Sequence, residues 1–158
     1  MPITPFHFGP GGALHAIAPR HISFLAFCAA NVVIDAESLY NLVHRREPVH
    51  AFLHTYVGAT LVWLGLAVLF WLAMRWPWLA RRTQLSLRPV ALGALLGAYS
   101  HVLLDSVMHH DIQPLAPFAA GNALQGLVSL SALHLGCVGL GLAALAVMTV
   151  RWLLAEKS

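Results

Sequence analysis

Charged side chains are scarce in this sequence, in which Asp, Glu, Lys and Arg make up only 9% of 158 residues. Soluble domains usually carry about a quarter charged residues. The chain is instead 59% hydrophobic, with a mean hydropathy of +0.73, and has too little polar surface to coat a soluble globule. The composition therefore predicts an integral membrane protein, organised as a single domain over residues 1–158.

Several common functional motifs are absent as well. The sequence contains no Ser-His-Asp nucleophile motif, no phosphate-binding glycine loop and no nucleotide motif, which weakens the corresponding enzyme classes. Its nine Lys and Arg residues are scattered rather than grouped with aromatic residues, so no nucleic-acid partner is expected. Cys28 and Cys137 lie in apolar runs, where two buried thiols are favoured over a disulfide. No oligomeric state follows from the sequence.

Long apolar runs dominate what is present. A helix that crosses a bilayer needs about 20 mainly apolar residues. Three segments meet this requirement clearly, at about 54–76, 87–109 and 127–154, and a fourth at 21–43 is long enough but contains Asp35 and Glu37. The predicted fold class is therefore all-α, a polytopic membrane protein with about four transmembrane helices.

The segment before these runs is too short to span a bilayer. It also lacks the basic start and long apolar core of a cleavable signal peptide. We expect an N-terminal half-helix or re-entrant segment that turns at Pro19 and Arg20 and is covered by protein or by a water-filled cavity. A plain surface segment is the alternative.

Basic residues predict the orientation, because cytoplasmic loops carry the excess of Lys and Arg. With four spans, one face collects Arg75, Arg81, Arg82, Arg88, Arg151 and Lys157. The loop after His109 has no basic residue, which suits the outer face, although Arg45 and Arg46 on that side argue against this assignment. We predict that the first face is cytoplasmic.

Polar side chains within or beside the apolar runs gather at one predicted depth, toward the outer face. A charged group near the bilayer centre costs at least about 2.5 kcal/mol and is usually functional. The residues concerned are Asp35, Glu37, His50, His54, His101, Asp105, His109 and His134. Chance would not favour this arrangement, so we interpret them as one site. A packing role is the alternative for His134, and an exposed loop position for His110 and Asp111.

The third span carries the pattern H-x3-D-x3-H at His101, Asp105 and His109. Residues four apart lie on the same face of a helix, so these three form one stripe, and His50 and His54 repeat the spacing. Zinc accepts His nitrogen and carboxylate oxygen. The pattern predicts one or two divalent ions, preferably zinc, against a hydrogen-bond network without metal.

Asp35 and Glu37 are two residues apart and would point in different directions on a regular helix. Either the chain bends there, or one carboxylate orients a ligand histidine, as is common in metal sites. Asp35 is predicted as a metal ligand, against a buried structural ion pair. Both Asp35 and Glu37 are candidates for the general base.

Four motifs follow one another along the first three quarters of the chain. They are T-P-F-H-F-G with His7, V-I-D-A-E with Asp35 and Glu37, P-V-H-A-F-L-H-T with His50 and His54, and G-A-Y-S-H-V-L-L-D-S with His101 and Asp105. This ordered set, over about residues 4–118, resembles the YdjM-type family of inner-membrane metal-dependent hydrolases. The match departs from the family pattern in a split Thr-His, a Glu for the second Asp, and a reversed Thr-His pair.

The resemblance implies a location in the inner membrane and a role for His7 and His50 as further metal ligands. It also implies a reaction class rather than a substrate, and the family has a suggested distant likeness to zinc-dependent phospholipase C. Because the site lies toward the outer membrane boundary, we expect hydrolysis of a lipid or lipid-linked phosphoester. The alternatives are a metal-binding or transport protein without hydrolase activity, and a structural protein in which the polar cluster joins helices.

Overall fold

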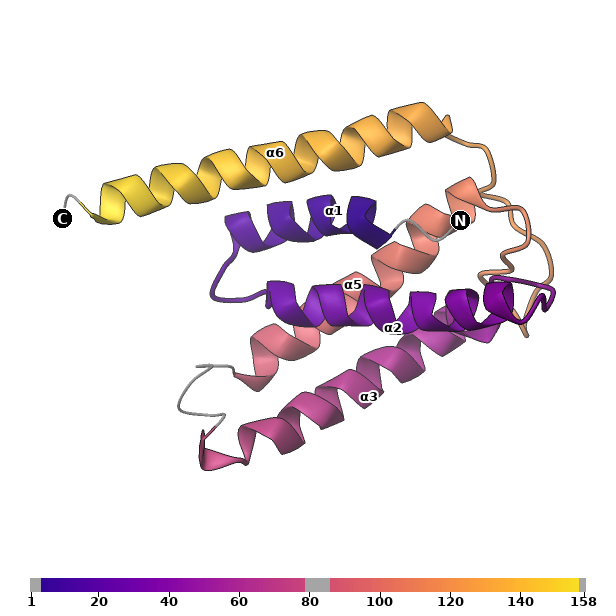
Figure 1. Cartoon of the computed structure of the whole chain (residues 1–158), viewed down its shortest axis with the longest axis horizontal. Coiled ribbons are helices and arrows are strands. Elements are labelled where there is room, and N and C mark those ends of the chain that lie inside the picture. Colours follow the sequence, from indigo (N-terminus) through magenta and orange to yellow (C-terminus); the bar gives the residue numbers. More distant parts are fainter. Residues whose placement is uncertain (1–3, 79–85, 157–158) are drawn as a thin grey trace.

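The computed structural model describes residues 4–78 and 86–156, and these residues form helices and loops without a strand (Figure 1). The elements are α1 (Thr4–Ile17), α2 (Phe24–Val43), the 3-10 turn η1 (Phe52–His54), α3 (Tyr56–Met74), α5 (Leu87–Met108) and α6 (Leu130–Ala155). The predicted all-α class is confirmed. Both cysteines are free thiols.

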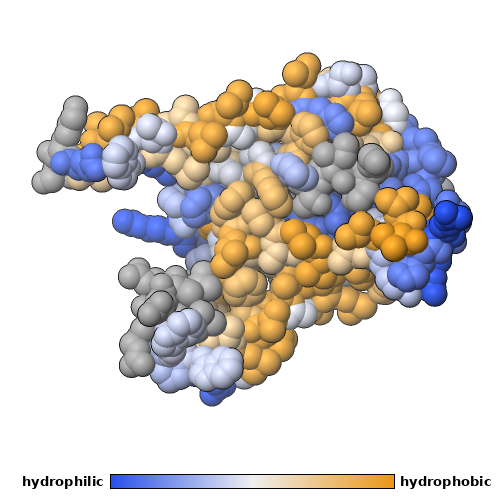
Figure 2. All heavy atoms as spheres, in the orientation of Figure 1, coloured by the Kyte–Doolittle hydropathy of each residue, from blue (hydrophilic) through white to orange (hydrophobic). Residues whose placement is uncertain are grey.

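Three of the described helices are long and apolar enough to cross a membrane, namely α3, α5 and α6. The prediction of four spans is therefore corrected. The helix α2 has 20 residues, but buried polar side chains such as Asn31, Asp35 and Ser38 lower its hydropathy. Many large apolar side chains of α3 and α6 are exposed, and Figure 2 shows them as broad hydrophobic surfaces. Surfaces of this kind suit contact with lipid.

The short helix α1 corresponds to the predicted half-helix, although it begins earlier, at Thr4. Its 14 residues span about 21 Å, less than the ~30 Å hydrocarbon core of a bilayer. It packs between α6 and α2, and the chain then reverses at residues 18–23, close to the predicted turn. Gly9 lies so close to α6 that a Cβ there would overlap the Cys137 carbonyl. The protein thus covers α1 on both sides.

Small residues hold α2, α3 and α5 close together. The core is formed mainly by Ala26, Ala30, Ile34, Ala59, Val62, Leu66, Val90, Ala94, Ala98 and Val102. Small side chains at helix contacts let the backbones of membrane helices approach closely. Gly97 of α5 lies so close to α2 that a Cβ there would lie 2.5 Å from the Phe27 carbonyl oxygen. This contact brings the two helices close enough for side chains of α2 to reach those of α5 toward the C-terminal ends of both helices.

Gly97→Ala is expected to lower the free energy of unfolding by about 1–3 kcal/mol, because overpacking forces the backbones of α2 and α5 apart. Gly136→Ala is the matched control, since a Cβ at Gly136 in α6 has no neighbour within 4 Å. Thermal unfolding of both variants in the same detergent measures the difference. Equal midpoints for Gly97→Ala and Gly136→Ala would contradict the packing described here.

Candidate metal centre

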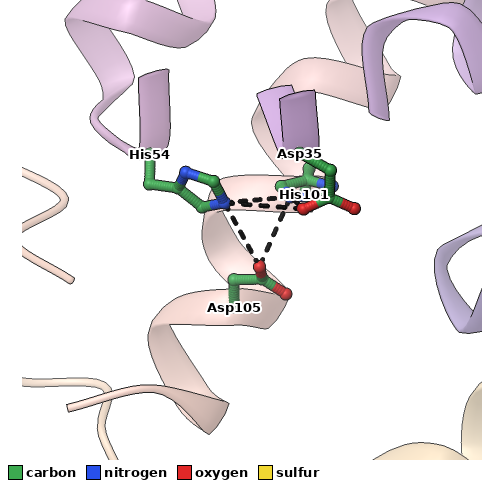
Figure 3. A group of neighbouring side chains, drawn as sticks. All are labelled: Asp35, His54, His101 and Asp105. Carbon is green, nitrogen blue, oxygen red and sulfur yellow. Dashed lines mark hydrogen bonds and ion pairs between the residues drawn. The ribbon is translucent and has the colours of Figure 1, made fainter. Parts of the chain in front are cut away.

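Four buried side chains from three elements converge at one end of the bundle (Figure 3). They are Asp35 of α2, His54 of η1, and His101 and Asp105 of α5. His54 and His101 are 0% exposed, and Asp105 is 2% exposed. One donor atom from each residue lies within 4.8 Å of the others, close enough to hold a metal ion. The interpretation of these four residues as parts of one cluster is confirmed.

Five of the six distances between the donor atoms are close to those of a tetrahedral ligand set. His101 Nε2 is 3.3 Å from His54 Nε2, from Asp35 Oδ1 and from Asp105 Oδ2. His54 Nε2 is 3.5 Å from Asp105 Oδ2 and 3.8 Å from Asp35 Oδ1. Ligand atoms at about 2.0–2.1 Å from a tetrahedral zinc ion lie about 3.3 Å from one another. The four side chains therefore fit an ion of that size.

The orientation of the His101 ring is fixed by a hydrogen-bond chain from α2. The Asn31 amide nitrogen donates to the Phe27 carbonyl at 2.8 Å, so its oxygen faces His101 Nδ1 at 2.9 Å. A carbonyl oxygen only accepts, so His101 Nδ1 carries the proton and Nε2 offers its lone pair to the cluster. This contact was missed in the sequence, although Asn31 lies one turn before Asp35 on the same helical face.

The cluster collects electron-pair donors and so requires positive charge. Burial lowers the pKa of His54, but hydrogen bonds with the carboxylates of Asp105, Asp35 and Glu37 raise it to about 10. A proton on His54 is therefore one way to balance the two buried carboxylates. A proton is shared between two atoms, whereas four donor atoms converge here. A metal ion meets that requirement more fully.

Glu37 lies at the opposite edge of the His54 ring from the cluster. Its Oε2 is 4.0 Å from His54 Nδ1 and accepts the Leu53 backbone N–H at 2.6 Å. The helix α2 runs unbroken through this stretch, and the two carboxylates reach opposite edges of the His54 ring, Asp35 at Nε2 and Glu37 at Nδ1. The bend considered for this stretch does not occur. The position of Glu37 fits a residue that orients His54, which leaves Asp35 as the better-placed candidate base.

His7 approaches the same centre from α1. Its Nε2 lies 3.0 Å from Asp105 Oδ1, and its ring stacks on His101 with centroids 4.4 Å apart. His7 is only 2% exposed, but it belongs to neither group of side chains that could hold a metal ion. The contact with Asp105 fits a residue that orients this carboxylate, and a role as metal ligand stays a prediction.

A second group, which shares Asp105, contains His50 and His109. The helix α5 ends at Met108, one residue before the predicted end at position 109. His109 therefore lies just beyond the helix and has an extended backbone. Burial and the neighbouring His50 ring lower the pKa of His109 to about 4. Burial also lowers the pKa of His50, against the opposing hydrogen bond to Asp111. Both rings are therefore neutral near pH 7.

The remaining candidates take other positions. Asp111 contacts His50 rather than the first cluster, and its oxygens lie 2.9 and 3.0 Å from His50 Nδ1. Burial alone would raise the pKa of Asp111, but its hydrogen bonds with His50 hold it below the usual value. His110 is exposed. His134 stacks on Phe6 at 4.2 Å, which supports the packing role considered for it.

Fold and site together define an all-α membrane protein with a buried His and Asp cluster that can accommodate a metal ion. No family model, curated protein or solved structure matches the chain. The resemblance to the YdjM-type family therefore stays a prediction.

Proposed function

We propose that this protein is a membrane-bound, metal-dependent hydrolase that acts on a lipid or lipid-linked phosphoester. One observation carries the proposal. Four donor atoms from Asp35, His54, His101 and Asp105 lie within 4.8 Å of one another and are buried among the helices. Polar groups buried in a membrane protein are costly, and this arrangement exceeds what helix packing needs.

A cavity beside the site supports an amphiphilic substrate. It has a volume of about 580 Å³, and its walls include the apolar side chains of Phe52 and Pro117 together with His50 and Asp111. An apolar wall suits acyl chains, and the polar side suits a headgroup. The cavity lies at the end of the bundle where α2 and α5 end and α3 begins, as expected for a substrate from the membrane boundary.

The proposed reaction is hydrolysis of a P–O ester bond by water. A divalent ion, preferably zinc, would be held by His54, His101 and Asp105, with one position left for water beside Asp35. Such an ion would lower the pKa of its water to about 7 and polarise a phosphoryl oxygen. The water oxygen forms the new bond to phosphorus, and the bond to the leaving alcohol breaks. Asp35 accepts the proton from water and returns one to the leaving oxygen, so that an alcohol and a phosphate monoester or free phosphate result.

Transport across the membrane is less well supported. The half of the bundle away from the site is filled by the apolar core between α2, α3 and α5, including Val62, Leu66 and Val90. An ion path would continue a line of polar groups through this region. Among the described residues, the buried polar side chains of these helices instead concentrate in the site half.

We further propose that the site faces the outer side of the inner membrane. The proposal rests on the positive-inside rule and on basic residues at the far end of the bundle. Of these, Arg75, Arg88 and Arg151 belong to the described residues. Arg81, Arg82 and Lys157 lie outside them. Cysteine accessibility at positions 45 and 88 in intact cells measures the orientation directly.

Activity is tested with purified protein in lipid nanodiscs, loaded with zinc and given a panel of phospholipids and polyprenyl phosphoesters. Release of phosphate or headgroup by the wild type, and its loss in Asp35→Asn, is the expected result. His44→Ala serves as the matched control, because this histidine is exposed. A metal-loaded wild type that leaves every ester intact contradicts the hydrolase and leaves a metal-binding protein.

Glu37→Gln distinguishes an orienting role from general-base catalysis. Loss of a group that orients a metal-bound histidine typically lowers metal affinity 10–100-fold, and we expect a loss of this size. Competition titration with a chromogenic zinc chelator measures it, with the exposed Glu47→Gln as control. Unchanged zinc affinity with lost activity would instead identify Glu37 as the base.

A further inference from the structure

His50 carries a buried nitrogen that the first cluster does not use. The residue is 5% exposed, and its Nε2 has no hydrogen-bond partner among the described residues. Its Nδ1 lies 2.9 and 3.0 Å from the two oxygens of Asp111, which also accepts the His50 backbone N–H at 3.0 Å. A carboxylate can only accept here, so Nδ1 bears the proton and Nε2 bears a lone pair.

This contact is the arrangement that carboxylates make behind metal-bound histidines. Such a carboxylate fixes the tautomer and the ring orientation and increases the basicity of the other nitrogen. Leaving that nitrogen buried without a partner carries a free-energy cost. The buried Nε2 therefore calls for an electron-pair acceptor, which is either a hydrogen-bond donor or a metal cation.

The other donors of the second group are close by. His50, His109 and Asp105 each offer one atom, and these atoms lie within 4.8 Å of one another. The rings of His50 and His109 stack with centroids 4.1 Å apart. Two backbone hydrogen bonds hold His109 in place. Its backbone N–H donates to the Asp105 backbone carbonyl at 2.8 Å, and its backbone carbonyl accepts from the Asn122 side-chain amide at 3.2 Å.

We propose that His50, His109 and Asp105 form a second divalent-metal site, so that Asp105 bridges two cations. The inference rests on the proposed hydrolase centre, because Asp105 belongs to both groups of ligands. Two nitrogens and one carboxylate leave positions open for water or substrate, as catalytic zinc sites do. Paired metal ions of this kind clamp the attacking and leaving oxygens of a phosphoester.

The second site also lies nearer to the cavities than the first does. His50 lines the cavity of about 580 Å³, and His50, His109 and Asp111 line a neighbouring cavity of about 240 Å³. Neither His101 nor His54 lines either cavity. A phosphoester that enters from the membrane boundary would therefore meet the second ion first.

Metal content of the full chain in detergent tests the proposal. Protein saturated with zinc and freed of excess metal is expected to hold two ions per chain by mass spectrometry, and His50→Ala one. After loading with Mn²⁺, the wild type should give the electron paramagnetic resonance signal of an exchange-coupled pair. His50→Ala should give that of isolated Mn²⁺. His44→Ala and His21→Ala, at exposed positions, should match the wild type.

Asp111→Asn provides an independent variant that keeps His50 in place. In a zinc titration, this variant should lower the affinity for the second ion 10–100-fold and leave the affinity for the first ion unchanged. One ion in the wild type and in His50→Ala would overturn the second site but not the first. No ion in the wild type would overturn the proposed hydrolase centre as well. Two ions in folded His50→Ala would overturn the assignment of His50 as a ligand. An unaltered zinc titration in Asp111→Asn would overturn the role of Asp111 in orienting His50.

Discussion

Asp105→Asn is expected to remove both metal ions and to lower the rate of phosphoester hydrolysis by at least about 1000-fold. Asp105 contacts His7, His54 and His101 within 3.5 Å and is shared by both groups of donor atoms. An amide has nearly the same shape, but it lacks the negative charge. Its NH₂ group would also compete with a cation for the histidine lone pairs. Loss of about 4 kcal/mol of transition-state stabilisation corresponds to this factor.

The control is His44→Ala, at an exposed position outside the site. Asp111→Asn, the same chemical change at a neighbouring carboxylate, should lose the second ion and keep the first. Metal content and hydrolysis rate are measured on the same preparations, with the helix content checked by circular dichroism. Full zinc content and wild-type activity in Asp105→Asn would contradict the assignment of this residue.

Removal of metal by a chelator is expected to lower the thermal midpoint of the wild type by about 10 °C. A ligand at a thousand times its dissociation constant stabilises the folded state by about 4 kcal/mol. Each kcal/mol corresponds to about 2–4 °C for a chain of this length. The physical reason is that Asp35 and Asp105 are buried within one cluster, where their charges repel unless a cation lies between them.

This experiment separates a metal centre from a cluster that merely joins helices. The midpoint should recover when zinc is returned, and His101→Ala should no longer respond to the chelator. A hydrogen-bond network without metal predicts the same midpoint with and without chelator. His21→Ala, at an exposed position outside the site, should behave like the wild type.

Spacing along single helices was predictable because helix geometry is local. His101 and Asp105 are four residues apart, and α5 brings Nε2 and Oδ2 to 3.3 Å as the periodicity predicts. The number of spans was less predictable, because α2 exchanges apolar residues for buried polar ones that only its neighbours accommodate.

Partners from different helices were harder to predict. Asn31 reads as an isolated polar residue in an apolar run, yet it fixes His101 across the interface of α2 and α5. Asp111 reads as a loop residue, yet it orients His50 from 61 positions away. Each contact depends on how loops and helices close on one another, and no local pattern encodes that closure.

By itself, the sequence determined the membrane class, the all-helical fold and the residue types that can bind a metal, since composition and periodicity act locally. Only the tertiary structure decided which donors share a centre and which edge of each imidazole faces it. Small residues such as Gly97 let α2 and α5 approach closely. Because of this approach, the short side chain of Asp35 on α2 reaches His101 on α5. Packing over such distances depends on the whole bundle, so one helix alone cannot specify it.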